Sequence, residues 1–139
     1  IGCEVYVAPR SRKDKDPNLD ARYNHLILLA KNNDGYKNLA KLVSLGYTEG
    51  FYYKPRIDKE ALEQYHENLI CCSACLAGEV NQAILKNNME EAKKVALCFK
   101  KLFSISRILY LRLSPPAVNP FSDNTVKTSC SDILSQPLT

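Results

Sequence analysis

Short apolar segments alternate along the chain with longer segments in which apolar residues recur every three or four positions. Runs of about five to eight apolar and β-branched residues, with little polar alternation, are typical of strands that are buried on both faces. Such strands belong to parallel sheets covered by helices. Runs of this kind predict strands at Ile1–Ala8, His25–Ala30, Leu69–Ser73 and Ile108–Leu113.

Helical spacing fills the stretches between the second, third and fourth predicted strands. Asp58 can accept hydrogen bonds from the amides of a first helical turn, and is expected to begin one helix. Asn88 followed by Glu91 gives a capping-box pattern, which indicates the start of another. The segment from Tyr52 to Arg56 is predicted to be a loop. The expected apolar faces are Tyr36, Leu39, Val43 and Tyr47; Ala61, Leu62 and Tyr65; Val80, Ala83 and Ile84; and Ala92, Val95, Ala96, Phe99 and Leu102.

The order of these elements predicts an α/β fold in which helical crossovers join mainly parallel strands. The pattern does not separate a barrel from an open sheet. From about residue 114 prolines interrupt the chain, and serine, threonine and asparagine dominate without a period. Residues 114–139 are therefore expected to form a poorly ordered tail.

The composition, with 45% apolar and 24% charged residues, is that of an ordinary globular protein. A formal net charge of +4 inclines towards polyanionic partners. No apolar run reaches the roughly 18–20 residues of a membrane-spanning helix, and the first residues lack the pattern of a signal peptide. A cytoplasmic protein without a membrane partner is therefore expected. The six cysteines, two of them adjacent, indicate reduced thiols rather than a disulfide framework.

Cys72 and Cys75 form a CxxC pair at the end of a predicted strand. Such a pair can be half of a zinc site or a redox pair. A structural zinc site would need two further ligands, and only His25, His66 and isolated cysteines are available. Buried, inert thiols at a strand end are the alternative.

Glu4, His25 and Cys75 are further candidates for metal binding. Each lies in or beside a predicted apolar strand, and a carboxylate, an imidazole and a thiolate are ligands that borderline transition metals accept. Burying the carboxylate of Glu4 without a partner would be costly. Each residue also has a simpler explanation: an edge carboxylate, a hydrogen-bonded core histidine and an inert thiol.

Two segments carry cations and rings of the kind that contact nucleic acids. The tract from Arg10 to Asp16 has four basic side chains that could meet phosphates, but its acids dilute the charge and favour a solvated, mobile loop. The segment from Tyr52 to Arg56 pairs rings with cations, as single-strand binders do. Packing of Phe51 and the two tyrosines against the domain is the alternative. These patterns assign no residue to nucleic-acid binding.

A series of ordered blocks resembles the PHP (polymerase and histidinol phosphatase) domain of bacterial DNA polymerase III alpha subunits. The resemblance covers residues 1–113 as a partial domain, and five blocks in order are far more specific than one motif. Residues 114–139 do not share it. The blocks are Ile1–Ala8 (IGCEVYVA), His25–Asn32 (HLILLAKN), Gly35–Leu39 with Leu42–Ser44, Gly50–Asp58 (GFYYKPRID) and Ser73–Glu79 (SACLAGE).

This resemblance implies an irregular α/β barrel whose cleft holds divalent ions, zinc, manganese or magnesium, on His, Asp, Glu and Cys side chains. Glu4, His25 and Cys75 match ligand positions of the family, which leaves Cys72 as a packing residue. Some members are associated with metal-dependent 3′–5′ proofreading, and in others the domain is structural. DNA and the other polymerase subunits are the implied partners. Parallel strands place functional residues at their C-terminal ends, yet His25 begins its predicted strand.

The resemblance also implies that the chain is an incomplete piece of a longer DNA-directed DNA polymerase. The family's His-x-His and Asp-His motifs would precede the Gly-x-Glu block, and its last Asp and His ligands would follow residue 113. Arg112 replaces an acid of the family's pattern. The isolated chain is therefore expected to be inactive. A metal-free structural or docking module is one alternative, and a small zinc or redox protein built on Cys72 and Cys75 is another.

Overall fold

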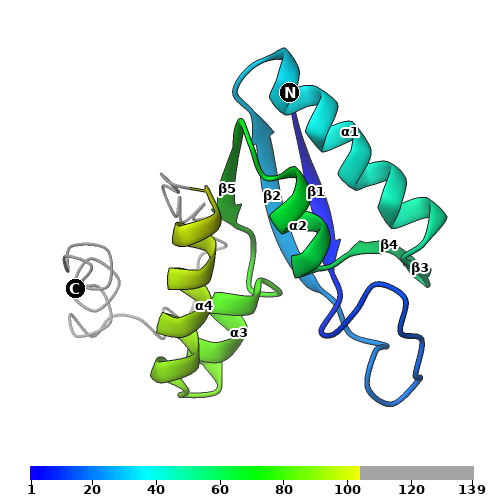
Figure 1. Ribbon diagram of the computed structural model, residues 1–139. Helices are drawn as coiled ribbons and strands as arrows, with labels where there is room; N and C mark the ends of the chain where they lie inside the picture. Colours follow the sequence, from blue (N-terminus) through cyan, green and yellow to red (C-terminus); the bar gives the residue numbers. More distant parts are fainter. Residues whose placement is uncertain (104–139) are drawn as a thin grey trace, which may run out of the picture.

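The computed structural model describes residues 1–103, in which a five-stranded sheet is combined with helices (Figure 1). The prediction of a mixed α/β fold is confirmed. The predicted strand at 108–113 and the predicted tail at 114–139 lie outside the described residues. The strands are β1 Gly2–Val7, β2 Asn24–Ala30, β3 Phe51–Tyr52, β4 Lys54–Ile57 and β5 Leu69–Ser73, and the helices are α1 Asn33–Thr48, α2 Lys59–Tyr65, α3 Glu79–Leu85 and α4 Met89–Phe103.

The strands lie in the order β3-β4-β1-β2-β5, and their directions correct one prediction. β1 and β4 run parallel, but β1 with β2, β2 with β5 and β3 with β4 run antiparallel. Mainly parallel pairing is therefore wrong for the described strands. The physical reason is the connection between β1 and β2, a long loop without a helix that turns the chain back beside itself. An apolar run indicates burial of a strand and not its direction.

Side-chain caps begin two helices where the sequence predicts them. The carboxylate of Asp58 accepts a hydrogen bond from the backbone N–H of Ala61 at 3.0 Å. The side-chain oxygen of Asn88 accepts one from the N–H of Glu91 at 3.1 Å. These bonds satisfy amides that the first turn of a helix leaves without a partner.

The apolar core lies between one face of the sheet and helices α1, α2 and α4. Val5 stands directly opposite Leu26, and Leu28 directly opposite Cys71, so these buried side chains share a face. Alternation along each strand sends the neighbouring residues to the other face. The helices contribute Leu39, Leu42, Ala61, Leu62, Val95, Phe99 and Phe103 to the core.

Within the described part of the chain, no helix is long and apolar enough to cross a membrane.

The segment predicted as a loop between α1 and α2 is a β-hairpin. Tyr52 pairs with Lys54, which leaves Tyr53 alone in the turn with a φ of 58°. Phe51 and Tyr53 are 50% and 71% exposed, so packing against the domain is wrong for these two rings. Tyr52 is partly buried, and the guanidinium of Arg56 lies 5.0 Å from the centre of its ring.

Buried arginines anchor the long loop between β1 and β2, which corrects the prediction of a mobile loop. Arg56 is fully buried and donates from Nη1 to the backbone oxygen of Asp20 and from Nη2 to that of Asp14, each at 2.8 Å. Arg12 is also buried and donates from Nη1 to the carboxylate of Asp58 at 2.8 Å. These contacts tie the loop to β4 and to the start of α2.

The Asp58 carboxylate should make the fold sensitive to acid. Burial alone would raise its pKa, but hydrogen bonds from the backbone of Arg12 and Ala61 and from the Arg12 guanidinium hold the pKa below its ordinary value of 3.8. Because the pKa is lower in the folded state, this carboxylate stabilises the fold above about pH 4, and its contribution is lost as the pH falls through the folded pKa. Asp58→Asn keeps a helix cap but loses the charge, so it should lower the free energy of unfolding at neutral pH by roughly 1–3 kcal/mol.

Urea unfolding followed by circular dichroism, at neutral and at acidic pH, measures both effects. Asp58→Asn should be less stable than the parent chain at neutral pH, and should lose less stability on acidification. Asp34→Asn, which changes an exposed acid at the start of α1, is the matched control and should behave as the parent does. Equal acid sensitivity in the parent and in Asp58→Asn would contradict this role of the carboxylate.

Candidate metal centre

Glu4, His25 and Cys75 come together on the face of the sheet opposite the core. Glu4 in β1 stands opposite Ile27 of β2, so His25, two residues before Ile27, is its diagonal neighbour on the same face. Cys75 lies in the turn between β5 and α3. The backbone N–H of His25 donates to the carbonyl of Ala77 at 3.1 Å, which ties this turn to the start of β2.

Nδ1 of His25 lies between the other two side chains. It is 2.7 Å from Oε1 of Glu4 and 3.5 Å from Sγ of Cys75, and one ligand atom of each residue lies within 4.8 Å of the others. Metal–ligand bonds of about 2.0–2.3 Å place neighbouring ligands of a tetrahedral zinc ion about 3–4 Å apart. The distance of 3.5 Å between the His25 nitrogen and the Cys75 sulfur lies in this range, and movement of the exposed Glu4 side chain would bring its oxygen into the range as well.

The cluster is open to solvent on one side. The side chains of Glu4 and His25 are 46% and 23% exposed, and Cys75 is also exposed. Catalytic metal sites keep a position open for water or substrate, whereas structural zinc sites are closed by four protein ligands. The three residues thus resemble part of an open site more than a complete structural one.

The direction of β2 explains how a residue at the start of a strand reaches this cluster. Because β2 runs antiparallel to β1 and β5, its first residues lie beside the last residues of those strands. Asn24 stands opposite Val7, and Leu26 stands opposite Ser73. His25 therefore lies at the same end of the strands as the turn that follows β5. A parallel sheet would place the start of β2 at the opposite end, so the conflict in the position of His25 disappears.

Two tyrosines that the sequence leaves unassigned enclose the ring of His25. The ring of Tyr6 meets it edge-on at 5.2 Å between centroids, and the ring of Tyr23 lies nearly parallel to it at 5.9 Å with 7° between the planes. Strand alternation could have found Tyr6, because it is two residues from Glu4 and faces the same side. The two rings restrict rotation of the imidazole.

The CxxC pair is divided between two environments. Cys72 is buried in β5 beside Cys71, whereas Cys75 is exposed beyond the strand end. Burial, with a smaller effect from Cys72, raises the pKa of Cys71 to about 12, so this thiol stays protonated. No disulfide joins the cysteines within residues 1–103. Of the pair, Cys75 alone belongs to the cluster with Glu4 and His25.

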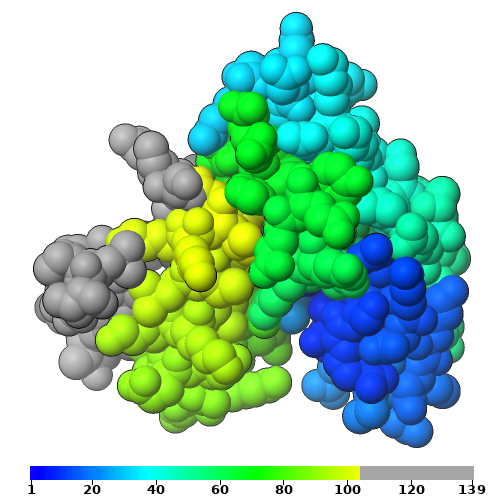
Figure 2. Space-filling model, viewed as in Figure 1, coloured from blue at the N-terminus to red at the C-terminus, as the bar shows by residue number. Residues whose placement is uncertain are grey.

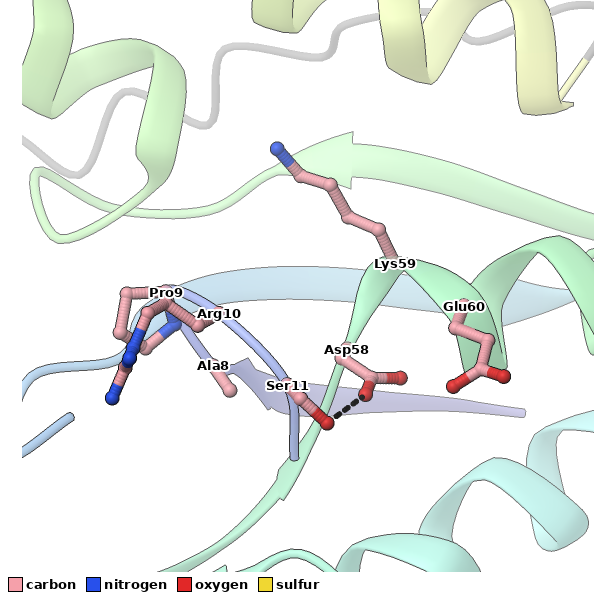
Figure 3. Close-up of a pocket in the computed structure, with 7 residues that line it drawn as sticks. All are labelled: Ala8, Pro9, Arg10, Ser11, Asp58, Lys59 and Glu60. Carbon is pink, nitrogen blue, oxygen red and sulfur yellow. Dashed lines mark hydrogen bonds between the residues drawn. The ribbon is translucent and has the colours of Figure 1, made fainter. Parts of the chain in front are cut away.

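A separate pocket of about 250 Å³ opens where β1 and β4 end (Figure 3). The hydroxyl of Ser11 donates across it to Asp58 at 3.5 Å. Its charged side chains are already paired: Lys59 with Glu79 at 2.8 Å, and Arg10 with an aspartate of its own loop. Asp58 and Glu60 are paired with Arg12, so each charged side chain of the lining has an ion-pair partner within residues 1–103. It is lined by Ala8, Pro9, Arg10, Ser11, Asp58, Lys59 and Glu60, none of which belongs to the cluster.

Several similar proteins carry the same name. The chain is 58% identical to the DNA polymerase III subunit alpha of Chlamydia pneumoniae over 143 aligned positions, which cover 99% of this chain and 11% of that protein. The DNA polymerase III subunit alpha of Chlamydia trachomatis is 44% identical over 142 positions, with the same shares covered. That of Borreliella burgdorferi is 55% identical over 104 positions, which cover 74% of this chain and 9% of the relative.

The chain thus spans only about a tenth of the length of these relatives. The family model of the PHP domain matches residues 1–113, which is well over half of the 139 residues. The chain therefore belongs to the PHP domain family.

Proposed function

We propose that this chain is part of the PHP domain of a DNA polymerase III alpha subunit, and that it holds part of a divalent-metal site for 3′–5′ cleavage of phosphodiesters. The observation that carries the proposal is the convergence of an oxygen, a nitrogen and a sulfur donor within 4.8 Å. Similarity to polymerase alpha subunits supports the context, which is DNA replication in the cytoplasm with DNA and other polymerase subunits as partners.

Each of the three residues is proposed to have its own role in metal binding. The sulfur of Cys75 favours zinc over manganese or magnesium, because thiolates select softer metals. Glu4 supplies an oxygen and offsets part of the positive charge. His25 binds through Nδ1, and Tyr6 and Tyr23 hold its ring in place. A bound divalent ion supplies Lewis acidity and lowers the pKa of a water molecule.

The five-stranded sheet is proposed to form one side of an irregular PHP-type barrel. Within the described residues β5 pairs with β2 alone and stands at the edge of the sheet, where another strand could continue it. Residues 1–113 are proposed to be the partial domain, with residues 114–139 outside it. Three ligands are fewer than the family's set, so the isolated chain is proposed to have neither nuclease nor polymerase activity. Nucleotidyl transfer is proposed for the full-length protein alone.

A metal-free structural or docking module is the second candidate. One observation favours it: His25 already has a hydrogen bond to Glu4 and contacts with two tyrosine rings, so its side chain is satisfied without a metal ion. In that case Glu4 and His25 would only stabilise the face of the sheet opposite the core, and Cys75 would bind no metal ion.

Cobalt(II) binding to the purified chain tests the metal site. Cobalt replaces zinc in similar sites, and a cysteine ligand gives a sulfur-to-cobalt charge-transfer band. The parent chain should develop this band on titration, and Cys75→Ser should lose it while other cobalt absorption weakens. The experiment reads the identity of a ligand and needs no enzymatic activity.

Cys98→Ser is the matched control, because Cys98 is a partly buried thiol of α4 that lies outside the cluster. It should give the same band as the parent chain. A parent chain that binds no cobalt at millimolar concentration, or a band that persists in Cys75→Ser, would overturn the proposed metal site and favour the structural module.

A further inference from the structure

A group of aromatic rings is exposed at the β3–β4 hairpin and the end of α1. Tyr47 and Phe51 are 61% and 50% exposed, and their rings stack at 6.4 Å between centroids with 29° between the planes. Tyr53, at the tip of the hairpin, is 71% exposed. Single apolar residues on a surface are ordinary, but rings gathered in one place indicate an interaction site.

The backbone of Tyr53 gives an independent reason to look for a function at this tip. Its φ of 58° lies in the left-handed region, where glycine or asparagine would fit with less strain. Its ring meets that of Tyr52 at 4.6 Å between centroids, but Tyr53 is 71% exposed, so packing alone does not explain a tyrosine at this position. Strain of this kind, kept where the fold does not need it, is typical of functional surfaces.

The lysines of the neighbouring loop are more exposed than its acids. Asp20 is buried and pairs with Arg10, and the carboxylate of Asp16 accepts backbone hydrogen bonds of the loop itself. Lys13 and Lys15 are exposed. The ammonium of Lys13 lies 4.0 Å from a carboxylate oxygen of Glu49 that is already bound by a buried arginine. The acids that dilute this tract in the sequence, Asp14 and Asp16, are only partly buried, and Asp14 lies 3.8 Å from Arg10, so they offset the exposed lysines in part.

The loop and the hairpin adjoin one another (Figure 1, Figure 2). A Cβ atom built on Gly50, just before Phe51, would lie 3.2 Å from Cβ of Arg12, so the two backbones are in close contact. Arg56 also links the loop to the hairpin, because it donates to the backbone oxygen of Asp14 and its guanidinium lies over the ring of Tyr52. The exposed lysines of the loop thus border the exposed rings of the hairpin.

We propose that this surface, consisting of Tyr47, Phe51 and Tyr53 with Lys13, Lys15 and Lys54, binds single-stranded nucleic acid. Exposed rings can stack on bases whose faces are open, and lysines beside them can contact the phosphates. A duplex hides the faces of its bases, so stacking on rings selects a single strand. Binding of this kind needs both the exposed rings and the exposed lysines. The sequence alone does not show which of these side chains reach solvent. The surface does not depend on the metal centre or on its proposed function.

Fluorescence anisotropy of a labelled oligothymidylate, at low salt and with EDTA present, tests the proposal on the whole chain. The chelator removes the metal site from the experiment, so failure here is distinct from failure of the metal-site proposal. Phe51→Ala and Tyr53→Gly should each weaken binding by about 5- to 150-fold. Tyr53→Gly should remain folded, because glycine enters the left-handed region freely. Tyr36→Ala, at the other end of α1 and also 50% exposed, should bind as the parent does.

The lysines are tested by the dependence of binding on salt. Lys13→Gln and Lys54→Gln should each reduce the slope of log affinity against log salt by about 0.7, whereas Lys94→Gln on α4 should leave it unchanged. Equal affinity for single strand and duplex, or unchanged affinity in Phe51→Ala and Tyr53→Gly, would overturn the proposal. A chain that binds no oligonucleotide at low salt would also overturn it, and would indicate a protein partner for these rings.

Discussion

Arg56→Leu is expected to lower the free energy of unfolding by roughly 3–5 kcal/mol, because it removes three hydrogen bonds from a fully buried guanidinium and leaves the oxygens of Asp14 and Asp20 without that donor. The guanidinium of Arg56 reaches the oxygens of Asp14 and Asp20 at 2.8 Å each and that of Gly50 at 3.3 Å. Leucine can fill much of the volume but donates no hydrogen bond. The loop between β1 and β2 should therefore loosen together with the hairpin that supports it.

Urea unfolding of the purified chain measures this loss. Arg22→Leu is the matched control, because Arg22 is an exposed arginine of the same loop, and its replacement should change stability by less than about 0.5 kcal/mol. Arg56→Lys should recover little, since an ammonium group cannot span three acceptors as a planar guanidinium does. A difference below about 1 kcal/mol between Arg56→Leu and the parent would contradict the anchoring role.

Local patterns were sufficient to predict most elements but not how the strands pair. The strand Leu69–Ser73 and the caps at Asp58 and Asn88 were found correctly, because each depends on residues only a few positions away. Strand direction depends on the loop between β1 and β2. That loop is held by Arg56, which lies 36 and 42 positions from the two loop residues that it binds, and no local period records such a contact.

The candidate metal site needed more than local chemistry. His25 lies 21 positions from Glu4 and 50 from Cys75, so the three were separate candidates until family resemblance joined them. The structure then brought their ligand atoms together, which makes a shared site a testable proposal. Strand alternation from Glu4 is enough to indicate Tyr6, whereas Tyr23 lies in the loop before β2 and carries no signal until the strands are paired.

Charge was the property that the sequence described least well. In the Tyr52–Arg56 segment both Lys54 and Arg56 counted as available cations, yet Arg56 is fully buried and only Lys54 reaches solvent. In the tract from Arg10 to Asp16 the net charge gives the two acids the same weight as the two lysines, yet Asp14 and Asp16 are partly buried and Lys13 and Lys15 are exposed. Burial is set by tertiary contacts, so the sign of a surface cannot be read from net charge along a segment.

Zinc is expected to stabilise the folded chain, and His25→Ala should abolish that effect. A ligand that binds only the folded state adds about 2.7 kcal/mol to the free energy of unfolding when its free concentration is a hundred times Kd. His25→Ala removes the nitrogen that lies between Glu4 and Cys75, so the two remaining donors should bind zinc more than about a hundredfold more weakly. Chemical unfolding at increasing zinc concentration, with EDTA as the reference condition, measures the linkage.

His66→Ala separates a metal site from a structural role, because His66 is the other of the two histidines in the sequence. Its Nδ1 lies 2.8 Å from the carbonyl of Glu63, near the start of β5 and at the opposite end of the sheet from His25. This variant should keep the full stabilisation by zinc. If His25 acts only through Glu4 and the tyrosine rings, His25→Ala would instead cost the same stability with and without zinc. Equal zinc-dependent changes in the free energy of unfolding of the two variants would therefore overturn the metal site. His25 would then only stabilise the face of the sheet opposite the core.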